Sequence, residues 1–214
     1  MNAGKSTALL QANHNYLERG MQTMLFTYSG DNRFGKSQIV SRIGISADAA
    51  TFNSKTDLIN ELNQCSSREN IKCVLVDEAQ FLTKKQVIQL GMIVDELEIP
   101  VLTFGIRTDF QGELFEGSKY LLAWADNLKE IKTVCWCGRK ATMVVRINAD
   151  GEIISEGKQL EIGGNEKYIP LCRAHFREKK LAYWNISIWT NTEKIEPRNR
   201  PAPSQRHHFP ITIK

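Results

Sequence analysis

Two short groups of residues carry side chains that could transfer a phosphoryl group. Gly4-Lys5-Ser6-Thr7 is the second half of a phosphate-binding loop, in which backbone N–H groups, a lysine and a hydroxyl hold polyphosphate at the start of a helix. Asp77-Glu78 follows an apolar run, and such a pair can hold Mg²⁺ and accept a proton from an attacking hydroxyl. Either group alone could be an ordinary helix start or strand cap. Together they predict nucleotide-dependent phosphoryl transfer.

A second group of residues has the composition of a metal site. Cys135 and Cys137 form one pair, and Cys172 and His175 form another. Three thiolates and an imidazole are ligands that tetrahedral Zn²⁺ takes, although C-x-C is less common than C-x-x-C. Four protein ligands leave no open position, so the predicted zinc is structural. The alternative is three unrelated cysteines and a surface histidine.

The elements that must position these residues alternate between helix and strand. Residues 5–19 read as the helix after the loop, and residues 23–28, 73–76 and 101–104 as strands. Thr83 with Gln86 is a capping box that begins a helix with apolar positions up to Leu97. This order predicts an α/β fold, a P-loop NTPase-like parallel sheet with flanking helices. A hairpin of residues 143–147 and 159–162 would complete a small zinc-ribbon-like domain.

The chain divides into three predicted parts. Residues 1–132 form the nucleotide-binding kinase domain, residues 133–182 a zinc-binding domain with a substrate-closing loop, and residues 183–214 a tail. The tail holds four of the six prolines, so we expect disorder, although its tryptophans could dock on the body or on another subunit.

Composition narrows the function classes. The 214 residues are 42% hydrophobic and 24% charged, with a net charge of +4, which is ordinary for a globular protein. No long Lys/Arg run indicates a nucleic-acid or membrane surface, and no apolar stretch is long enough for a membrane span. We therefore expect a cytoplasmic protein that binds neither nucleic acid nor membrane.

The sequence begins inside the phosphate-binding loop, because the first glycine of G-x-x-x-x-G-K-[ST] would lie two residues before Met1. The strand that normally precedes such a loop is missing as well, and we expect its place to be beside strand 73–76. One interpretation is an internal methionine, with the natural start about ten residues upstream. The other is a genuine truncation.

Several separated motifs resemble those of the zinc-containing (type II) thymidine kinases of bacteria, in the same order, over residues 1–180. The motifs are Gly4-Lys5-Ser6-Thr7, Asp31-Asn32-Arg33-Phe34, Val76-Asp77-Glu78-Ala79-Gln80-Phe81, Gly105-Ile106-Arg107-Thr108-Asp109-Phe110, the four metal ligands, and Ile162-Gly163-Gly164-Asn165-Glu166-Lys167-Tyr168. This set is far more specific than the loop fragment alone.

The resemblance implies transfer of the γ-phosphate of ATP to the 5′-hydroxyl of thymidine, with deoxyuridine as a second acceptor, in nucleotide salvage for DNA synthesis. Glu78 matches the family's proton acceptor. The implied nucleotide and Mg²⁺ contacts are Met1, Asn2, Ala3, Gly4, Lys5, Ser6, Asp31, Asn32, Arg33, Asp77, Glu78, Ala79 and Gln80. For Arg33, the alternative is a solvated loop charge.

The resemblance also implies an acceptor pocket and an assembly. The residues matching the pocket are Phe81, Phe110, Phe115, Gln159, Leu160, Glu161, Ile162, Gly163 and Tyr168. Each phenylalanine alone is more often a core residue. The implied cofactors are ATP with Mg²⁺ and a structural Zn²⁺, and the family is commonly homotetrameric.

Two alternatives from other classes stay open on the sequence. One is a zinc-ribbon P-loop ATPase that acts on nucleic acid, against which stands the lack of a clustered basic and aromatic surface near the ribbon. The other is a non-catalytic remnant of the kinase that has lost donor binding with its first strand.

Overall fold

The computed structural model describes residues 3–30, 37–66, 68–159 and 167–182 of the chain. Among these residues, none of the helices has the length and apolar character needed to cross a membrane.

The centre of the larger part is a parallel sheet with the strand order β4-β1-β5-β6. Its strands are β1 (Gln22–Tyr28), β4 (Ala50–Phe52), β5 (Ile71–Val76) and β6 (Val101–Thr103). Phe26 pairs with Val76, and Val76 pairs with Thr103, so the strands β1, β5 and β6 end at a common edge. The predicted α/β fold with a parallel sheet is confirmed.

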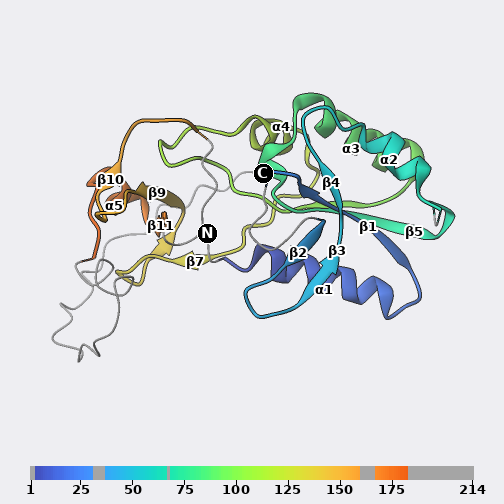
Figure 1. Cartoon of the computed structure of the whole chain (residues 1–214), viewed down its shortest axis with the longest axis horizontal. Helices are drawn as coiled ribbons and strands as arrows, with labels where there is room; N and C mark the ends of the chain where they lie inside the picture. The colour runs from blue at the N-terminus through green and yellow to red at the C-terminus, as the bar shows by residue number, and fades with distance from the viewer. Residues whose placement is uncertain (1–2, 31–36, 67, 160–166, 183–214) are drawn as a thin grey trace.

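Helices cover both faces of this sheet, as Figure 1 shows. They are α1 (Lys5–Leu17) on one face, and α2 (Leu58–Gln64) and α3 (Lys84–Leu97) on the other. Side chains alternate along β5: Cys73 and Leu75 pack with α1, and Val74 and Val76 pack with α2 and α3. Residues 73–76 of β5 are buried between these helices on both faces, which explains the continuous apolar run before Asp77.

The expectation that the strand before the loop belongs beside β5 is wrong. β5 is already paired on one side with β1 and on the other with β6. Hydrogen bonds to both neighbours satisfy the backbone of this buried strand within the described part of the chain.

Shorter elements complete the larger part of the molecule. The hairpin of β2 (Gln38–Val40) and β3 (Ser46–Asp48) is antiparallel, and the single turns η1 (Arg68–Asn70) and η2 (Ala79–Phe81) flank β5. Helix α4 (Glu116–Trp124) packs on η2 and α3.

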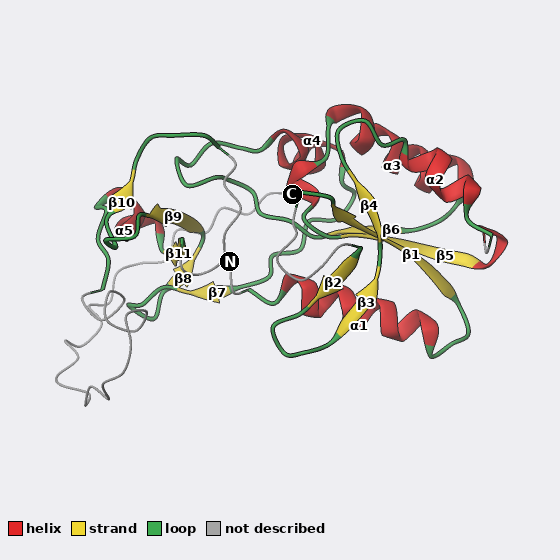
Figure 2. Cartoon of the chain, in the orientation of Figure 1, coloured by secondary structure: helices red, strands yellow, loops and turns green. Residues whose placement is uncertain are grey.

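The second part contains small antiparallel sheets, drawn on the left of Figure 2. Its elements are β7 (Thr133–Val134), β8 (Lys140–Ala141), β9 (Met143–Ile147), β10 (Ile153–Ile154), β11 (Tyr168–Leu171) and α5 (Arg173–Arg177). β9 is the central strand, between β10 and β11. The hairpin predicted with residues 159–162 is therefore wrong in its partner: Gln159 lies outside any strand, and residues 160–162 lie outside the described residues.

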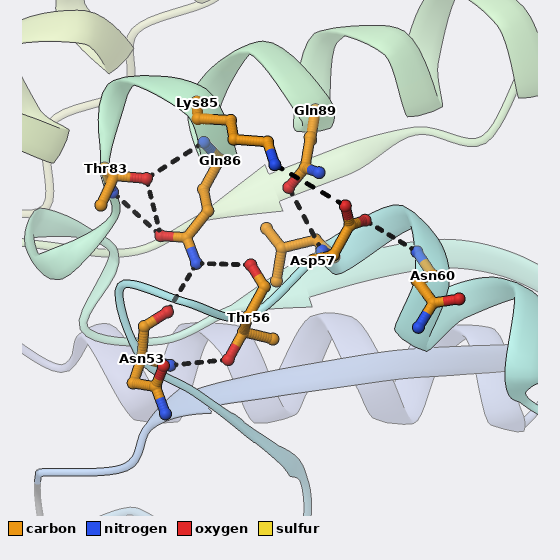
Figure 3. A network of polar contacts seen from close by, with 9 residues as sticks. Asn53, Thr56, Asp57, Asn60, Thr83, Lys85, Gln86 and Gln89 are labelled. Carbon is orange, nitrogen blue, oxygen red and sulfur yellow. Dashed lines mark hydrogen bonds and ion pairs between the residues drawn. The ribbon is translucent and has the colours of Figure 1, made fainter.

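The predicted capping box at α3 is confirmed and belongs to a larger polar network, drawn in Figure 3. The Gln86 amide is 1% exposed. Its oxygen accepts from the N–H of Thr83 at 2.9 Å, and its nitrogen donates to the carbonyls of Asn53 at 2.7 Å and Thr56 at 2.9 Å. One side chain thus joins the start of α3 to the loop after β4.

Replacing Gln86 should cost more stability than an ordinary surface change. Gln86→Ala leaves buried backbone groups without partners, so we expect the free energy of unfolding to fall by roughly 3 kcal/mol. Gln11→Ala is a matched control, because the Gln11 amide makes only an exposed contact with Asn15, and it should cost well under about 1 kcal/mol. Urea unfolding measures both, and equal losses would contradict the structural role of Gln86.

Candidate active site

The phosphate-loop fragment and the acidic pair meet at the edge where β1, β5 and β6 end. The Ser6 hydroxyl, in the first turn of α1, donates to a carboxylate oxygen of Asp77 at 2.9 Å. Gly4, directly before the helix, has φ 77°, a left-handed conformation that glycine adopts without strain. The first N–H groups of α1 and the Lys5 ammonium therefore begin beside the buried carboxylate.

The environment of Asp77 opposes its negative charge. Burial raises the pKa of this carboxyl to about 6, the neighbouring Glu78 adds to the rise, and the Ser6 hydrogen bond and the Lys5 charge oppose it. The side chain is 5% exposed. A hydroxyl and a carboxylate oxygen are ligands that Mg²⁺ takes together with substrate phosphates, so this pair could hold such an ion.

Glu78 is oriented by its backbone and by a neighbouring amide. It adopts φ 51°, ψ 38°, a left-handed conformation that a non-glycine residue holds only when its surroundings impose it. Gln80, 2% exposed, donates its amide N–H to the Glu78 carboxylate and accepts from the N–H of Ile106 at 3.2 Å. A Cβ at Gly105 would lie 2.9 Å from the Gln80 oxygen, so glycine leaves room for this amide.

Aromatic rings gather beside Glu78. The Phe81 ring lies 4.4 Å from Tyr28 and 5.7 Å, edge to face, from Phe115. Phe81 comes from η2 and Phe115 from the residue before α4, while Tyr28 is the last residue of β1. Tyr28 was not predicted as a site residue. Its position at the carboxyl end of a predicted strand is the feature that indicates such a role.

Three further predicted pocket residues, Phe110, Gln159 and Tyr168, come from different parts of the chain. Gln159 donates its amide to the Asp109 carboxylate at 2.9 Å, and Asp109 also accepts from the backbone N–H groups of Gln111 and Glu113. Phe110 is buried next to Asp109. Tyr168 begins β11. The structure thus brings Gln159 to the segment that contains Phe110 and Phe115.

The four predicted metal ligands lie together. Their ligand atoms, from Cys135, Cys137, Cys172 and His175, are all within 4.8 Å of one another. The Cys137 and Cys172 sulfurs are 4.0 Å apart. Zinc–sulfur bonds of about 2.3 Å would place ligand atoms about 3.8 Å apart in a tetrahedron. The residues therefore fit a closed Zn²⁺ site without an open position.

Protonation of this cluster is linked to metal binding. Burial raises the pKa of the Cys135 thiol to about 11 and lowers the pKa of His175 below its ordinary value. A metal must displace the thiol proton, whereas the imidazole is already in the neutral form that binds metal. Trp136 stacks on the His175 ring at 4.2 Å between centroids, with an interplanar angle of 3°.

The remaining predicted site residues divide into two sets. Ala3 lies just before α1, and Ala79 is buried at the start of η2. The others lie outside the described residues: Met1, Asn2, Asp31, Asn32, Arg33, Leu160, Glu161, Ile162 and Gly163, as does the predicted tail of residues 183–214.

Comparison with known proteins gives one consistent result. A family model described as thymidine kinase matches residues 1–176. A thymidine kinase of Haemophilus influenzae is 60% identical over 179 residues, covering 84% of this chain and 93% of that protein. One from Pasteurella multocida is 57% identical with the same coverage, and one from Salmonella paratyphi A is 57% identical over 83% of this chain and 87% of its own.

Metal analysis tests the cysteine–histidine cluster. We expect about one zinc per chain, lost in Cys135→Ser because a hydroxyl replaces a thiolate ligand. Cys65→Ser is the matched control, since Cys65 lies at the end of α2 and should leave the zinc in place. Mass spectrometry of purified protein measures the metal, and a zinc-free wild type or a fully loaded Cys135→Ser would contradict the assignment.

The raised pKa of Asp77 predicts a pH-dependent stability in protein without bound Mg²⁺. The folded-state value of about 6 lies above the ordinary 3.8, so the stability linked to this group is present at low pH and is lost as the pH rises through about 6. Asp77→Asn stays neutral and escapes this loss. Relative to wild type, its free energy of unfolding should therefore increase between about pH 4 and pH 7, by up to about 3 kcal/mol.

Asp95→Asn is the control for this measurement, because Asp95 is an exposed residue of α3. Urea unfolding without added Mg²⁺ and with zinc content checked, repeated at several pH values, compares the three proteins. A difference between Asp77→Asn and wild type that does not change with pH would show that Asp77 is not held in an environment that opposes its charge.

Proposed function

Because this chain belongs to the thymidine kinase family, we propose that its phosphate-binding loop and the acidic end of β5 together perform the phosphoryl transfer of a thymidine kinase. The reaction transfers the γ-phosphate of ATP to the 5′-hydroxyl of thymidine and gives dTMP. The observation that carries the mechanism is the hydrogen bond between Ser6 and Asp77, which brings the phosphate-binding helix to the acidic strand end.

The donor side of the reaction belongs to α1 and β5. The N–H groups that open α1 bind phosphate oxygens, and Lys5 stabilises the negative charge that develops on the transferred group. Ser6 and Asp77 would hold Mg²⁺, which neutralises charge on the phosphates when bound. The family resemblance adds Arg33 and its neighbours Asp31 and Asn32 as further phosphate contacts.

Glu78 is the proposed proton acceptor. Its carboxylate follows the strand that carries Asp77, at the end of the sheet where nucleotide sites form in α/β proteins. The Gln80 amide, which donates to Glu78, holds the carboxylate in one orientation, and this supports a role for Gln80 through Glu78. A carboxylate in this place accepts the proton of the 5′-hydroxyl as the oxygen attacks the γ-phosphate.

The acceptor pocket is proposed around the aromatic group. Phe81, Phe110 and Phe115 provide apolar surface for the thymine ring and its 5-methyl group, and Tyr28 extends that surface. Gln159 and Tyr168 belong to the predicted zinc-binding domain and are the described members of the closing loop that the resemblance implies. The resemblance adds residues 160–163 to the pocket. Contact of Tyr28 with thymidine is our addition to the family pattern.

Family membership favours the kinase over both alternatives, the nucleic-acid ATPase and the non-catalytic remnant. A homotetramer, a cytoplasmic location and the division into residues 1–132, 133–182 and 183–214 stay predictions.

Removing the proposed base tests the mechanism. Glu78→Gln keeps the shape of the side chain and one oxygen that can accept from Gln80 but cannot accept the proton, so turnover should fall by about 10²-fold or more. Binding of thymidine and ATP, measured by calorimetry, should stay within about twofold. Glu96→Gln, the same change on the exposed surface of α3, should leave turnover unchanged.

The two possible failures are separable. A wild-type protein that forms no dTMP from thymidine and ATP would contradict the function. A Glu78→Gln variant with normal turnover would contradict only the role of Glu78.

A further inference from the structure

Arg146 is a buried charged residue in the middle of an apolar strand. It belongs to β9, where its neighbours are Val144, Val145 and Ile147, and it is 4% exposed. Burying a guanidinium is costly unless its charge and its donors are compensated by well-placed partners. Apolar packing alone therefore does not explain an arginine at this position of β9.

Two separate segments of the described chain supply partners to Arg146. Its guanidinium lies over the Phe110 ring, 4.0 Å from the ring centre. It donates to the carbonyl of Lys158 at 3.0 Å and to that of Glu156 at 3.4 Å. Only a planar guanidinium can stack on a ring with its face and donate to carbonyls with its edge. A lysine side chain ends in one ammonium group, so it cannot contact the Phe110 ring and both carbonyls in this geometry.

The segment of residues 156–158 is fitted closely to this side chain. Gly157 has φ 133°, and a Cβ there would lie 2.5 Å from an Arg146 guanidinium nitrogen. Glycine is thus required both by the backbone conformation and by the close approach of the arginine. Such a fit holds the chain directly before Gln159 in one position.

The two segments that Arg146 joins also meet each other. Gln159, one residue after Lys158, donates to Asp109, one residue before Phe110. Arg146 therefore contacts the neighbours of both residues in the Gln159–Asp109 hydrogen bond, Lys158 on one side and Phe110 on the other. Tyr168, a third residue of that pocket, pairs with Arg146 across the β9–β11 ladder.

We propose that Arg146 is a positioning residue for thymidine, which holds the Phe110 ring and the chain at Gln159 in the arrangement that binds the nucleoside. This inference rests on the proposed function. Without the guanidinium, the ring and the 156–159 segment gain freedom that thymidine binding must then remove, and this cost weakens binding. The proposed ATP-site residues Ser6, Asp77 and Glu78 lie at the end of the parallel sheet. Loss of the Arg146 guanidinium should therefore leave ATP binding unchanged.

The test is a comparison of KM values for the two substrates. Arg146→Met keeps the length of the side chain but removes the ring contact and the donors. We expect KM for thymidine to rise about tenfold or more, and KM for ATP to stay within about twofold. Arg107→Met is the matched control: Arg107 is exposed and also joins the two parts of the molecule, through the Thr142 carbonyl at 3.4 Å, but it should leave both KM values within about twofold.

Zinc content and melting temperature are measured on each variant, because a purely structural role would lower stability and the active fraction while leaving KM for thymidine unchanged. If Arg146→Met does not fold, Arg146→Lys, which keeps the positive charge, decides the question. It should show the same selective rise, smaller in size. An unchanged KM for thymidine in a folded variant, or equal rises for both substrates, would overturn the proposal, whereas a wild type without thymidine phosphorylation would overturn the proposed function itself.

Discussion

The contact between Ser6 and Asp77 is the interaction on which the arrangement of the proposed catalytic residues depends. It joins residues 71 positions apart, and packing makes it possible: Leu9 and Leu10 of α1 lie in one cluster with Cys73 and Leu75 of β5. This packing fixes the position of α1 along β5, so that the first turn of the helix reaches the Asp77 carboxylate. The apolar face of one helix therefore decides where the phosphate-binding groups stand relative to the acids.

The proposed catalytic residues Asp77 and Glu78 each have an energetically unfavourable feature. Asp77 is buried in a place that raises its pKa to about 6, and Glu78 holds a left-handed backbone conformation. Neither feature stabilises the fold, and both place charge where phosphates and a hydroxyl would react. The rest of the sheet compensates, because β5 is paired on both sides and covered on both faces. A rigid strand can carry strained, functional residues at its end.

The zinc-binding part has a different physical basis. Its apolar cluster is small and includes two of the predicted metal ligands, Cys135 and Cys172, so coordination of the predicted zinc would substitute for a large core. Cys172 directly follows β11, whose Leu171 pairs with Met143 at the start of β9. The same strand carries Arg146. The metal cluster and the proposed pocket are thus connected through one short antiparallel ladder.

The local features of this protein could be predicted from its sequence. The apolar run before Asp77, the capping box of Thr83 and Gln86, and the cysteine–histidine pairs are each contained in a few neighbouring residues, so their patterns predict a buried strand, a helix start and a metal cluster. The tertiary structure was needed to show which strands flank β5, that β9 pairs with β10 and β11, and that Arg146 and Tyr28 lie near proposed site residues. Those choices depend on contacts between segments far apart in the chain, and periodicity along a segment carries no information about which distant segment it meets.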